Sequence, residues 1–312
     1  MKLPIIKSAI IAGGLALGAS SAYAGDALTV VSWGGAYTKS QIEAYHKPYT
    51  AKYGTKIQSE DYNGGLAEIR AQVEAGKITW DVVDLEVSDA ARGCDDGLFE
   101  KISAGSLPNG VNGALPSKDF IPGALQECAV GTIVWSTIYA YDADKYKSKK
   151  PTTISDFFDV KKFPGKRGMR KVPKVNLEWA LMADGVDGKD VYKVLATKAG
   201  QDRAFKKLDT IKNDVLWWEA GAQPPQMLAD GEVVMTSAYN GRIFNAAVTE
   251  KKNFEIVWDR QLFSFDLYAI IKGTPRLKEA LRYVQFSTAS EQLANQARWI
   301  SYGPTRKSSI KL

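Results

Sequence analysis

The stretch Leu28-Thr-Val-Val-Ser-Trp33 is the first of three short strand-like runs that decide the fold. Lys56-Ile-Gln58 and Asp81-Val-Val-Asp-Leu-Glu-Val87 follow it, and helix-like segments over residues 37–52 and 66–76 separate the three runs. β-Branched runs that alternate with helical segments at this spacing are typical of a parallel sheet covered by helices. We therefore expect an α/β fold.

The same alternation continues in the second half of the chain, which predicts a second α/β lobe. A long strand-like run covers residues 132–141, where the chain would cross between lobes. Further strands are expected at residues 232–238, 254–258 and 263–271, and helices at 176–184, 204–212 and 277–297. Two lobes joined by long strands predict a hinged cleft, and ligands bind at such interfaces and at the carboxyl ends of parallel strands.

The expected domain limits follow from these elements. Residues 25–133 would form lobe 1, and residues 134–262 would form lobe 2. Residues 263–312 would supply a return strand and C-terminal helices, mainly to lobe 1. Each lobe is expected to hold a mostly parallel sheet flanked by helices, with a two-strand hinge between the lobes.

The first 24 residues have the features of a secretory signal peptide. Lys2 and Lys7 form a basic start, residues 9–17 are apolar, and Ala22-Tyr-Ala24 matches a cleavage site. The apolar stretch is shorter than the roughly 20 residues that a transmembrane helix needs. We expect export to the periplasm with cleavage after Ala24. The formal net charge of +6 is too small to indicate a nucleic-acid partner.

The chain has two cysteines, Cys94 and Cys128. Because an exported protein meets an oxidising compartment, an even number of cysteines predicts a disulfide bond between them. Two free buried thiols are the alternative. In the chain-entropy model a bond across this loop stabilises the fold by about 3–4 kcal/mol.

The composition favours a binding protein over an enzyme. The chain has eight tryptophans and fourteen tyrosines but one histidine, His46, which lies in a polar helical segment and is expected to be exposed. The sequence contains no nucleophile elbow, no P-loop and no Cys/His metal cluster. We therefore expect no catalytic activity, no metal and no cofactor.

The candidate ligand residues are aromatic or charged and follow the predicted strands. Carboxylates among aromatic rings suit an ammonium ligand, because both groups attract a cation. Asp266 stands out, because an unpaired carboxylate in an apolar strand is costly. The full set is Trp33, Tyr37, Glu86, Trp218, Tyr239, Arg242, Asp266 and Tyr302.

Each assignment has a structural alternative. Glu86 could cap the following helix, and Asp266 could belong to a structural ion pair. Trp33, Trp135 and Trp258 could be core aromatics. Asn240-Gly241 is first of all a turn signal, and Arg170 and Lys171 are expected on a solvent-exposed face.

An ordered set of segments carries a family resemblance: residues 28–33, 80–85, 98–102, 231–241, the strand of Asp266, and 302–305. In these the chain resembles the periplasmic solute-binding proteins of ABC importers, of the spermidine/putrescine-binding type. The resemblance implies two lobes that close on a ligand, a monomer, and an ABC permease in the inner membrane as partner. Family members continue for several helices beyond the Tyr302 region, so we expect a chain ending at Leu312 to be either a short member or a truncated one.

One departure from the family bears on the ligand. Where polyamine binders carry acidic residues, this chain has the basic stretch Arg170-Lys171-Val-Pro-Lys174. A zwitterion fits better, with its amine on Asp266 or Glu86 and its carboxylate on Arg242 or Arg170. We expect a γ-amino acid, with putrescine or spermidine as the alternative ligand. An exported glycosidase using Glu86 and Asp266 is the alternative function, and a chemosensory role would use the same cleft.

Overall fold

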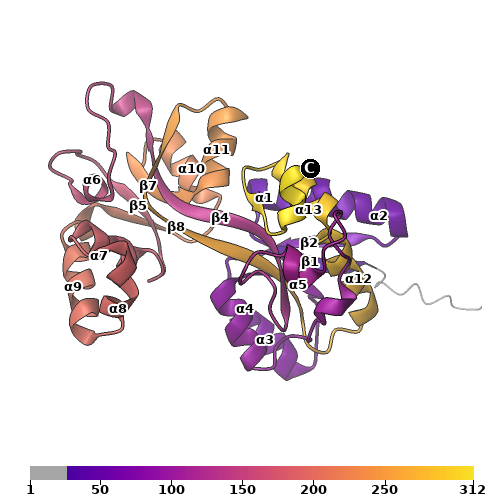
Figure 1. The fold of residues 1–312 in the computed structure, drawn as a ribbon. Coiled ribbons are helices and arrows are strands. Elements are labelled where there is room, and N and C mark those ends of the chain that lie inside the picture. Colours follow the sequence, from indigo (N-terminus) through magenta and orange to yellow (C-terminus); the bar gives the residue numbers. More distant parts are fainter. Residues whose placement is uncertain (1–26) are drawn as a thin grey trace, which may run out of the picture.

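The computed structural model describes residues 27–312. The predicted signal peptide and its cleavage site after Ala24 lie outside these residues. Figure 1 shows two lobes side by side, with α6 to α9 at the far end of one lobe and α2, α3, α5 and α12 in the other.

Each lobe contains three parallel strands. In lobe 1, β1 lies between β2 and β3, and in lobe 2, β5 lies between β6 and β7. In sequence order these strands are β1 (Leu28–Ser32), β2 (Ile57–Asp61), β3 (Val82–Glu86), β5 (Arg167–Arg170), β6 (Val215–Trp218) and β7 (Met235–Tyr239).

Two long antiparallel strands, β4 (Ala129–Asp142) and β8 (Phe254–Ile270), cross from one lobe to the other (Figure 1). β8 pairs with β3 in lobe 1, β4 pairs with β7 in lobe 2, and the short β9 (Gly303–Pro304) pairs with β4. The order is β2-β1-β3-β8-β4-β7-β5-β6. The two-lobed α/β fold is confirmed, although the sheet is mixed because the crossing strands are antiparallel to their neighbours.

The strands predicted separately at residues 254–258 and 263–271 are one strand, β8. Both parts pair with β4, on either side of residues 258–261, which have no register partner in it. The register shifts there: Leu262 pairs with Thr137, but Val257 pairs with Tyr139. Arg260 in this irregular stretch has a φ of 56°, and Trp258 is half exposed, so it is not a core residue.

The helices cover the two faces of the sheet. No helix among residues 27–312 has both the length and the apolar character required to cross a membrane. Their bounds are α1 (Gly35–Gln41), α2 (Lys47–Tyr53), α3 (Ala67–Ala75), α4 (Val87–Asp95), α5 (Pro116–Asp119), α6 (Ile154–Phe158), α7 (Asn176–Ala183), α8 (Val191–Leu195), α9 (Lys198–Asp209), α10 (Gln223–Ala229), α11 (Asn240–Val248), α12 (Leu277–Ser287) and α13 (Ser290–Ala297).

The helix predicted over residues 37–52 is interrupted, and the expected exposure of His46 is wrong. A π-helical segment, Ile42–His46, joins α1 to α2 just before Pro48, which has no N–H to continue an α-helical ladder. His46 is 5% exposed because α12 and α13 pack over this segment, and its ring lies beside that of Tyr283. Burial lowers the pKa of His46 to about 4.

Two further local expectations change. Asn240-Gly241 is not a turn: it begins α11, directly after β7. The helix expected over residues 277–297 is two helices, α12 and α13, which are separated at Thr288 and Ala289.

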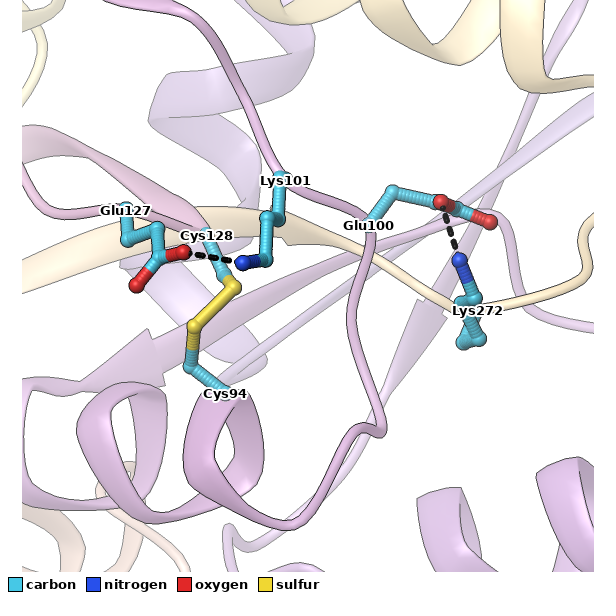
Figure 2. The surroundings of a disulfide bond; sticks show 6 residues. All are labelled: Cys94, Glu100, Lys101, Glu127, Cys128 and Lys272. Atoms are coloured by element: carbon cyan, nitrogen blue, oxygen red, sulfur yellow. Dashed lines mark hydrogen bonds and ion pairs between the residues drawn. A yellow bond between two sulfur atoms is a disulfide. The ribbon is translucent and has the colours of Figure 1, made fainter.

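The predicted disulfide bond joins Cys94 and Cys128 (Figure 2). Cys94 lies near the end of α4, and Cys128 directly precedes β4. An ion pair between Lys101 and Glu127 lies beside the bond in Figure 2. The bond therefore ties α4 to the start of a crossing strand within lobe 1.

Candidate functional site

A cavity lies where the two lobes meet, with an empty volume of about 290 Å³. We call it the inner cavity. Seven of the eight residues predicted from the sequence line it, and the eighth, Trp218, lines an adjoining cavity. The lining residues are Trp33, Tyr37, Glu86, Ile133, Trp135, Tyr239, Arg242, Asp266 and Tyr302.

The strand ends explain why residues so far apart in the sequence meet here. Trp33 directly follows β1, Glu86 is the last residue of β3, and Tyr239 is the last residue of β7. The carboxyl ends of parallel strands in both lobes face the junction. β8 brings Asp266 beside Glu86, because these two residues are register partners.

Asp266 is a buried carboxylate that has no ion pair with any residue in the part of the chain that the structure describes. The indole N–H of Trp135 donates to its Oδ1 at 2.7 Å. Burial, followed by the nearby Asp84 and Glu86, raises the pKa of Asp266 well above its ordinary value. Because no described residue forms an ion pair with Asp266, the structural ion-pair alternative finds no support. A cationic ligand group would favour the ionised form of its carboxyl group.

Glu86 is already neutralised by two cations of lobe 2. Arg170 donates to its Oε1 at 2.7 Å, and Lys174 donates to its Oε2 at 2.6 Å. Burial alone would raise the pKa of Glu86, but these two ion pairs lower it. Glu86 occupies the N-cap position of α4 without capping it through its side chain. Its carboxylate therefore bridges the lobes.

Arg170 does not lie on the solvent-exposed face that the sequence suggested. It ends β5, which points its side chain into the junction, and 15% of that side chain is exposed. Its guanidinium lies 5.8 Å from the Trp33 ring centre and 5.9 Å from that of Tyr239. A protein cation therefore already contacts these two rings. Lys171, by contrast, is exposed as expected.

Arg242 connects the lobes through backbone carbonyls. It lies in the first turn of α11, and its Nη1 and Nη2 donate to the carbonyl oxygens of Gly34 and Trp33, both at 2.9 Å. Glycines make room for it, because a Cβ on Gly35 or Gly221 would lie 3.0 Å from the guanidinium. Its Nε is buried without a hydrogen-bond partner among residues 27–312. Arg242 thus keeps its buried Nε–H as a donor for an anionic group.

Asp84 and Trp135 were not predicted as site residues. The Tyr37 hydroxyl and the Gln41 amide both donate to Asp84 Oδ2, at 2.8 and 2.5 Å, while its Oδ1 is buried without a partner in the described chain. Burial raises the pKa of Asp84 to about 7. Asp84 and Glu86 are two residues apart in β3, so they share a face of the strand. The sequence signal that could have identified Asp84 is this spacing, which places it two residues before Glu86 in an apolar run.

Two lobes connected by two crossing strands, around a buried cavity of charged and aromatic side chains, define a two-lobed ligand-binding protein. The chain belongs to the bacterial extracellular solute-binding protein family, whose model matches residues 44–311. The predicted class, a solute-binding protein of ABC transport, is confirmed. Among residues 27–312, no group of three or more His, Cys, Asp or Glu side chains could hold a metal ion.

Similar proteins come from both sequence and structure comparisons. The gamma-aminobutyric acid-binding protein of Pseudomonas aeruginosa is 44% identical over 299 residues, which are 96% of this chain and 82% of that protein. A solved GABA receptor is 32% identical with a TM-score of 0.77, covering 91% of this chain and 84% of its own. The binding protein MotA from A. tumefaciens B6, solved with glucopine, is 29% identical with a TM-score of 0.84, covering 91% and 85%.

Proposed function

We propose that this protein captures a small zwitterionic amino acid in the inner cavity, with γ-aminobutyrate as the first candidate. The observation that carries the proposal is the pairing of two groups across one small cavity. Asp266 is a buried carboxylate without a cation, and Arg242 has an unused Nε–H donor. The naming of a 44% identical relative as a GABA-binding protein supports the same ligand.

The ligand's ammonium group would bind Asp266. Its Oδ2 receives no hydrogen bond from any described residue, whereas Oδ1 is held by Trp135. A charge-assisted hydrogen bond to a buried carboxylate contributes about 1.5–3 kcal/mol. The rings of Tyr37 and Tyr302, which meet edge to face at 5.6 Å, close another side of the cavity and keep water away from this contact.

The ligand's carboxylate would bind the free Nε–H of Arg242. Because Arg242 is held by the carbonyls of Gly34 and Trp33, its guanidinium is fixed in the closed junction without help from the ligand. Such preorganisation lowers the entropic cost of binding. The same two hydrogen bonds join α11 of lobe 2 to lobe 1, so the carboxylate contact and lobe closure would reinforce each other.

A polyamine ligand fits the cavity less well. Glu86 and Asp266 are the acids that line it, and Glu86 is occupied by Arg170 and Lys174. A second ammonium group would therefore meet two protein cations instead of a free carboxylate. Putrescine and spermidine remain the alternative ligands to be tested.

The glycosidase alternative finds no support in the arrangement of the two acids. Glycosidases place their carboxyl groups on opposite sides of the scissile bond, roughly 5–10 Å apart. Glu86 and Asp266 are instead register partners on adjacent antiparallel strands, so their side chains share one face of the sheet. The ion pairs of Glu86 also engage both of its oxygens.

Ligands that lack one charge test the proposal directly. Calorimetric titration would compare γ-aminobutyrate with butylamine, which lacks the carboxylate, and with butyrate, which lacks the amine. We expect each analogue to bind at least about 30-fold more weakly, the equivalent of one charge-assisted contact. Butylamine binding as tightly as γ-aminobutyrate would exclude the role of Arg242.

We also propose that the protein works as a monomer in the periplasm and delivers its ligand to an ABC permease of the inner membrane. Export there requires cleavage of the signal peptide. Cell fractionation followed by mass spectrometry of the mature N-terminus tests the location and the cleavage site, and light scattering tests the monomer. A cytoplasmic protein or a stable dimer would contradict this part.

A further inference from the structure

Asp84 is a buried acid beside the inner cavity that the proposed function does not use. Its side chain is fully buried, and its Oδ2 accepts from the hydroxyl of Tyr37, which lines the cavity. In the pairing of β3 with β8, Asp84 is opposite Tyr268 and Glu86 is opposite Asp266. Asp84 and Asp266 are therefore diagonal neighbours on one face of the sheet, with their Cα atoms roughly 7–8 Å apart. We call these two residues the acid pair.

No cation of the described chain neutralises the acid pair. Neither Asp84 nor Asp266 forms an ion pair with any of residues 27–312. Two cations lie nearby, but both have other partners. Arg170 is bonded to Glu86, and Arg242 donates to two backbone carbonyls of lobe 1. The acid pair would therefore carry two uncompensated negative charges if both of its members ionised.

The other titratable groups around the acid pair do not supply a positive charge. Glu86, the third acid on this face, keeps its own charge because Arg170 and Lys174 engage both of its oxygens. The remaining groups are tyrosines, whose pKa is raised by burial, so they stay neutral. They are Tyr37, Tyr45, Tyr62, Tyr239, Tyr268, Tyr283 and Tyr302.

Two buried acids at this separation ionise together only at a high cost in free energy. Removal from water disfavours the charged form of each carboxyl group, and a like charge nearby disfavours it further. Burial raises the pKa of Asp84 to about 7. Burial, followed by the charges of Asp84 and Glu86, raises the pKa of Asp266 well above its ordinary value. An ammonium group on Asp266 would remove this cost, because it supplies the missing positive charge.

We propose that Asp84 and Asp266 share a proton in the unliganded cavity, and that an ammonium ligand displaces this proton to solvent when it binds. The inference rests on the proposed function, because it places the ligand's ammonium group on Asp266. In this step a carboxyl O–H bond breaks and the proton passes to water. The ammonium group keeps its own protons and donates N–H bonds to the carboxylate that is left.

Displacement of a proton makes the affinity depend on pH with a defined sign. Where the free acid pair holds its proton, binding must expel it, so the affinity falls as pH falls. We expect the affinity for γ-aminobutyrate to be about tenfold weaker at pH 6 than at pH 8, as one linked proton with a midpoint near pH 7 requires. The ligand does not titrate in this range, because amines and carboxylic acids of this kind titrate at about pH 10 and about pH 4.

Calorimetry counts the displaced protons directly. The mature wild-type protein is titrated with γ-aminobutyrate at one pH in two buffers, one with a small and one with a large ionisation enthalpy. The difference between the two binding enthalpies gives the number of protons released. We expect at least about half a proton per ligand at pH 7 and about one at pH 6.

Two variants should shift the release in opposite directions. Asp84→Asn removes the like charge beside Asp266, so the pH of half-maximal release should fall by about one pH unit or more. Tyr37→Phe removes a hydrogen bond that favours ionised Asp84, so this pH should rise, which tests the acid pair even if Asp84→Asn does not fold. Asp95→Asn, at an exposed site of α4, is the control and should leave it unchanged.

The outcomes separate this inference from the proposed function. If γ-aminobutyrate binds without releasing a proton between about pH 6 and about pH 8, the inference is overturned and the proposed function stands. If Asp84→Asn releases protons with the same pH dependence as the wild type, the proton is not shared with Asp84, which also overturns the inference. If γ-aminobutyrate does not bind, both proposals fail.

Discussion

At the scale of single residues, the charge of Asp266 governs the inner cavity. It is buried without a cationic partner in the described chain, so an ammonium ligand would supply the positive charge that the fold does not provide. Asp266 could be predicted from the sequence as a candidate ligand residue, because an unpaired carboxylate inside an apolar strand costs free energy. Arg170 was misjudged because its burial depends on β5, a strand of four residues whose pairing with β6 and β7 is long-range.

Replacing Asp266 with asparagine should weaken ligand binding strongly and preserve the fold. The amide keeps the size and can still accept from Trp135, but it cannot neutralise an ammonium group. We expect the affinity for γ-aminobutyrate to fall by about 30- to 100-fold, the equivalent of the lost charge-assisted bond. Thermal shift and calorimetry measure this, with Asp95→Asn at an exposed site of the same lobe as control. Retained binding, or an unfolded Asp266→Asn protein, would show that the carboxylate is structural.

The buried carboxyl of Asp84 should make the stability of the unliganded protein depend on pH. Burial raises its pKa from 3.8 to about 7, so between these values the folded protein holds a proton that the unfolded chain releases. The free energy of unfolding therefore falls as pH rises through this window. His46 acts oppositely below about pH 6.5, because its pKa is lowered to about 4 and the unfolded chain takes up the proton.

Comparison with Asp84→Asn isolates this contribution from that of His46. The variant has no proton to lose at position 84, so its stability relative to the wild type should rise between about pH 5 and about pH 8. We expect a relative gain of about 1–3 kcal/mol over that range. Urea unfolding at several pH values measures it. A difference between the two proteins that does not change with pH would contradict a raised pKa for Asp84.

At the scale of elements, side chains from β5 and α11 hold the two lobes together. Arg170 at the end of β5 bonds to Glu86 at the end of β3, and Arg242 in α11 bonds to the loop after β1. Opening of the junction would break these contacts, because each joins a residue of lobe 1 to a residue of lobe 2. The individual strands could be predicted from their β-branched residues, but the contacts between lobes could not, because they depend on the approach of segments about 80 to 200 residues apart.

Glu86→Gln should shift the unliganded protein towards an open arrangement. The change leaves Arg170 and Lys174 without an anionic partner in the closed junction, and opening returns both to water. Breaking a buried pair costs about 3–5 kcal/mol, which is enough to reverse a closure equilibrium. Small-angle X-ray scattering should show a larger radius of gyration than for the wild type. Glu219→Gln, which breaks the exposed pair with Lys171, is the control and should leave the radius unchanged.

Removing the disulfide bond should destabilise lobe 1 without changing the ligand site. Neither Cys94 nor Cys128 lines the inner cavity. The double variant Cys94→Ala/Cys128→Ala should lose about 3–4 kcal/mol of unfolding free energy, the loop-closure term for a separation of 34 residues. Denaturant titration measures the loss, and calorimetry should give an unchanged affinity at low temperature. An affinity loss as large as that of Asp266→Asn would mean that the bond shapes the cavity.

At the scale of the whole molecule, the alternation of strands and helices was enough to predict two α/β lobes. Each βαβ unit is local, so β1 to β3 could be placed from residues 28–87 alone. The mixed central part of the sheet could not be predicted, because β4 and β8 each bond to neighbours in both lobes. Because β4 and β8 connect the lobes, the lobes can move relative to each other about these two strands. We therefore expect the protein to capture its ligand by closure of the lobes.

The measurement that tests the central claim most directly is a calorimetric titration of the mature protein with γ-aminobutyrate and, separately, with putrescine. The two ligands share a four-carbon backbone and a terminal amine, and they differ in the second charged group. A cavity with one free carboxylate and one arginine donor predicts one-to-one binding of γ-aminobutyrate at about micromolar affinity or tighter. Putrescine should bind at least about 100-fold more weakly. Tight binding of putrescine with no binding of γ-aminobutyrate would contradict the account.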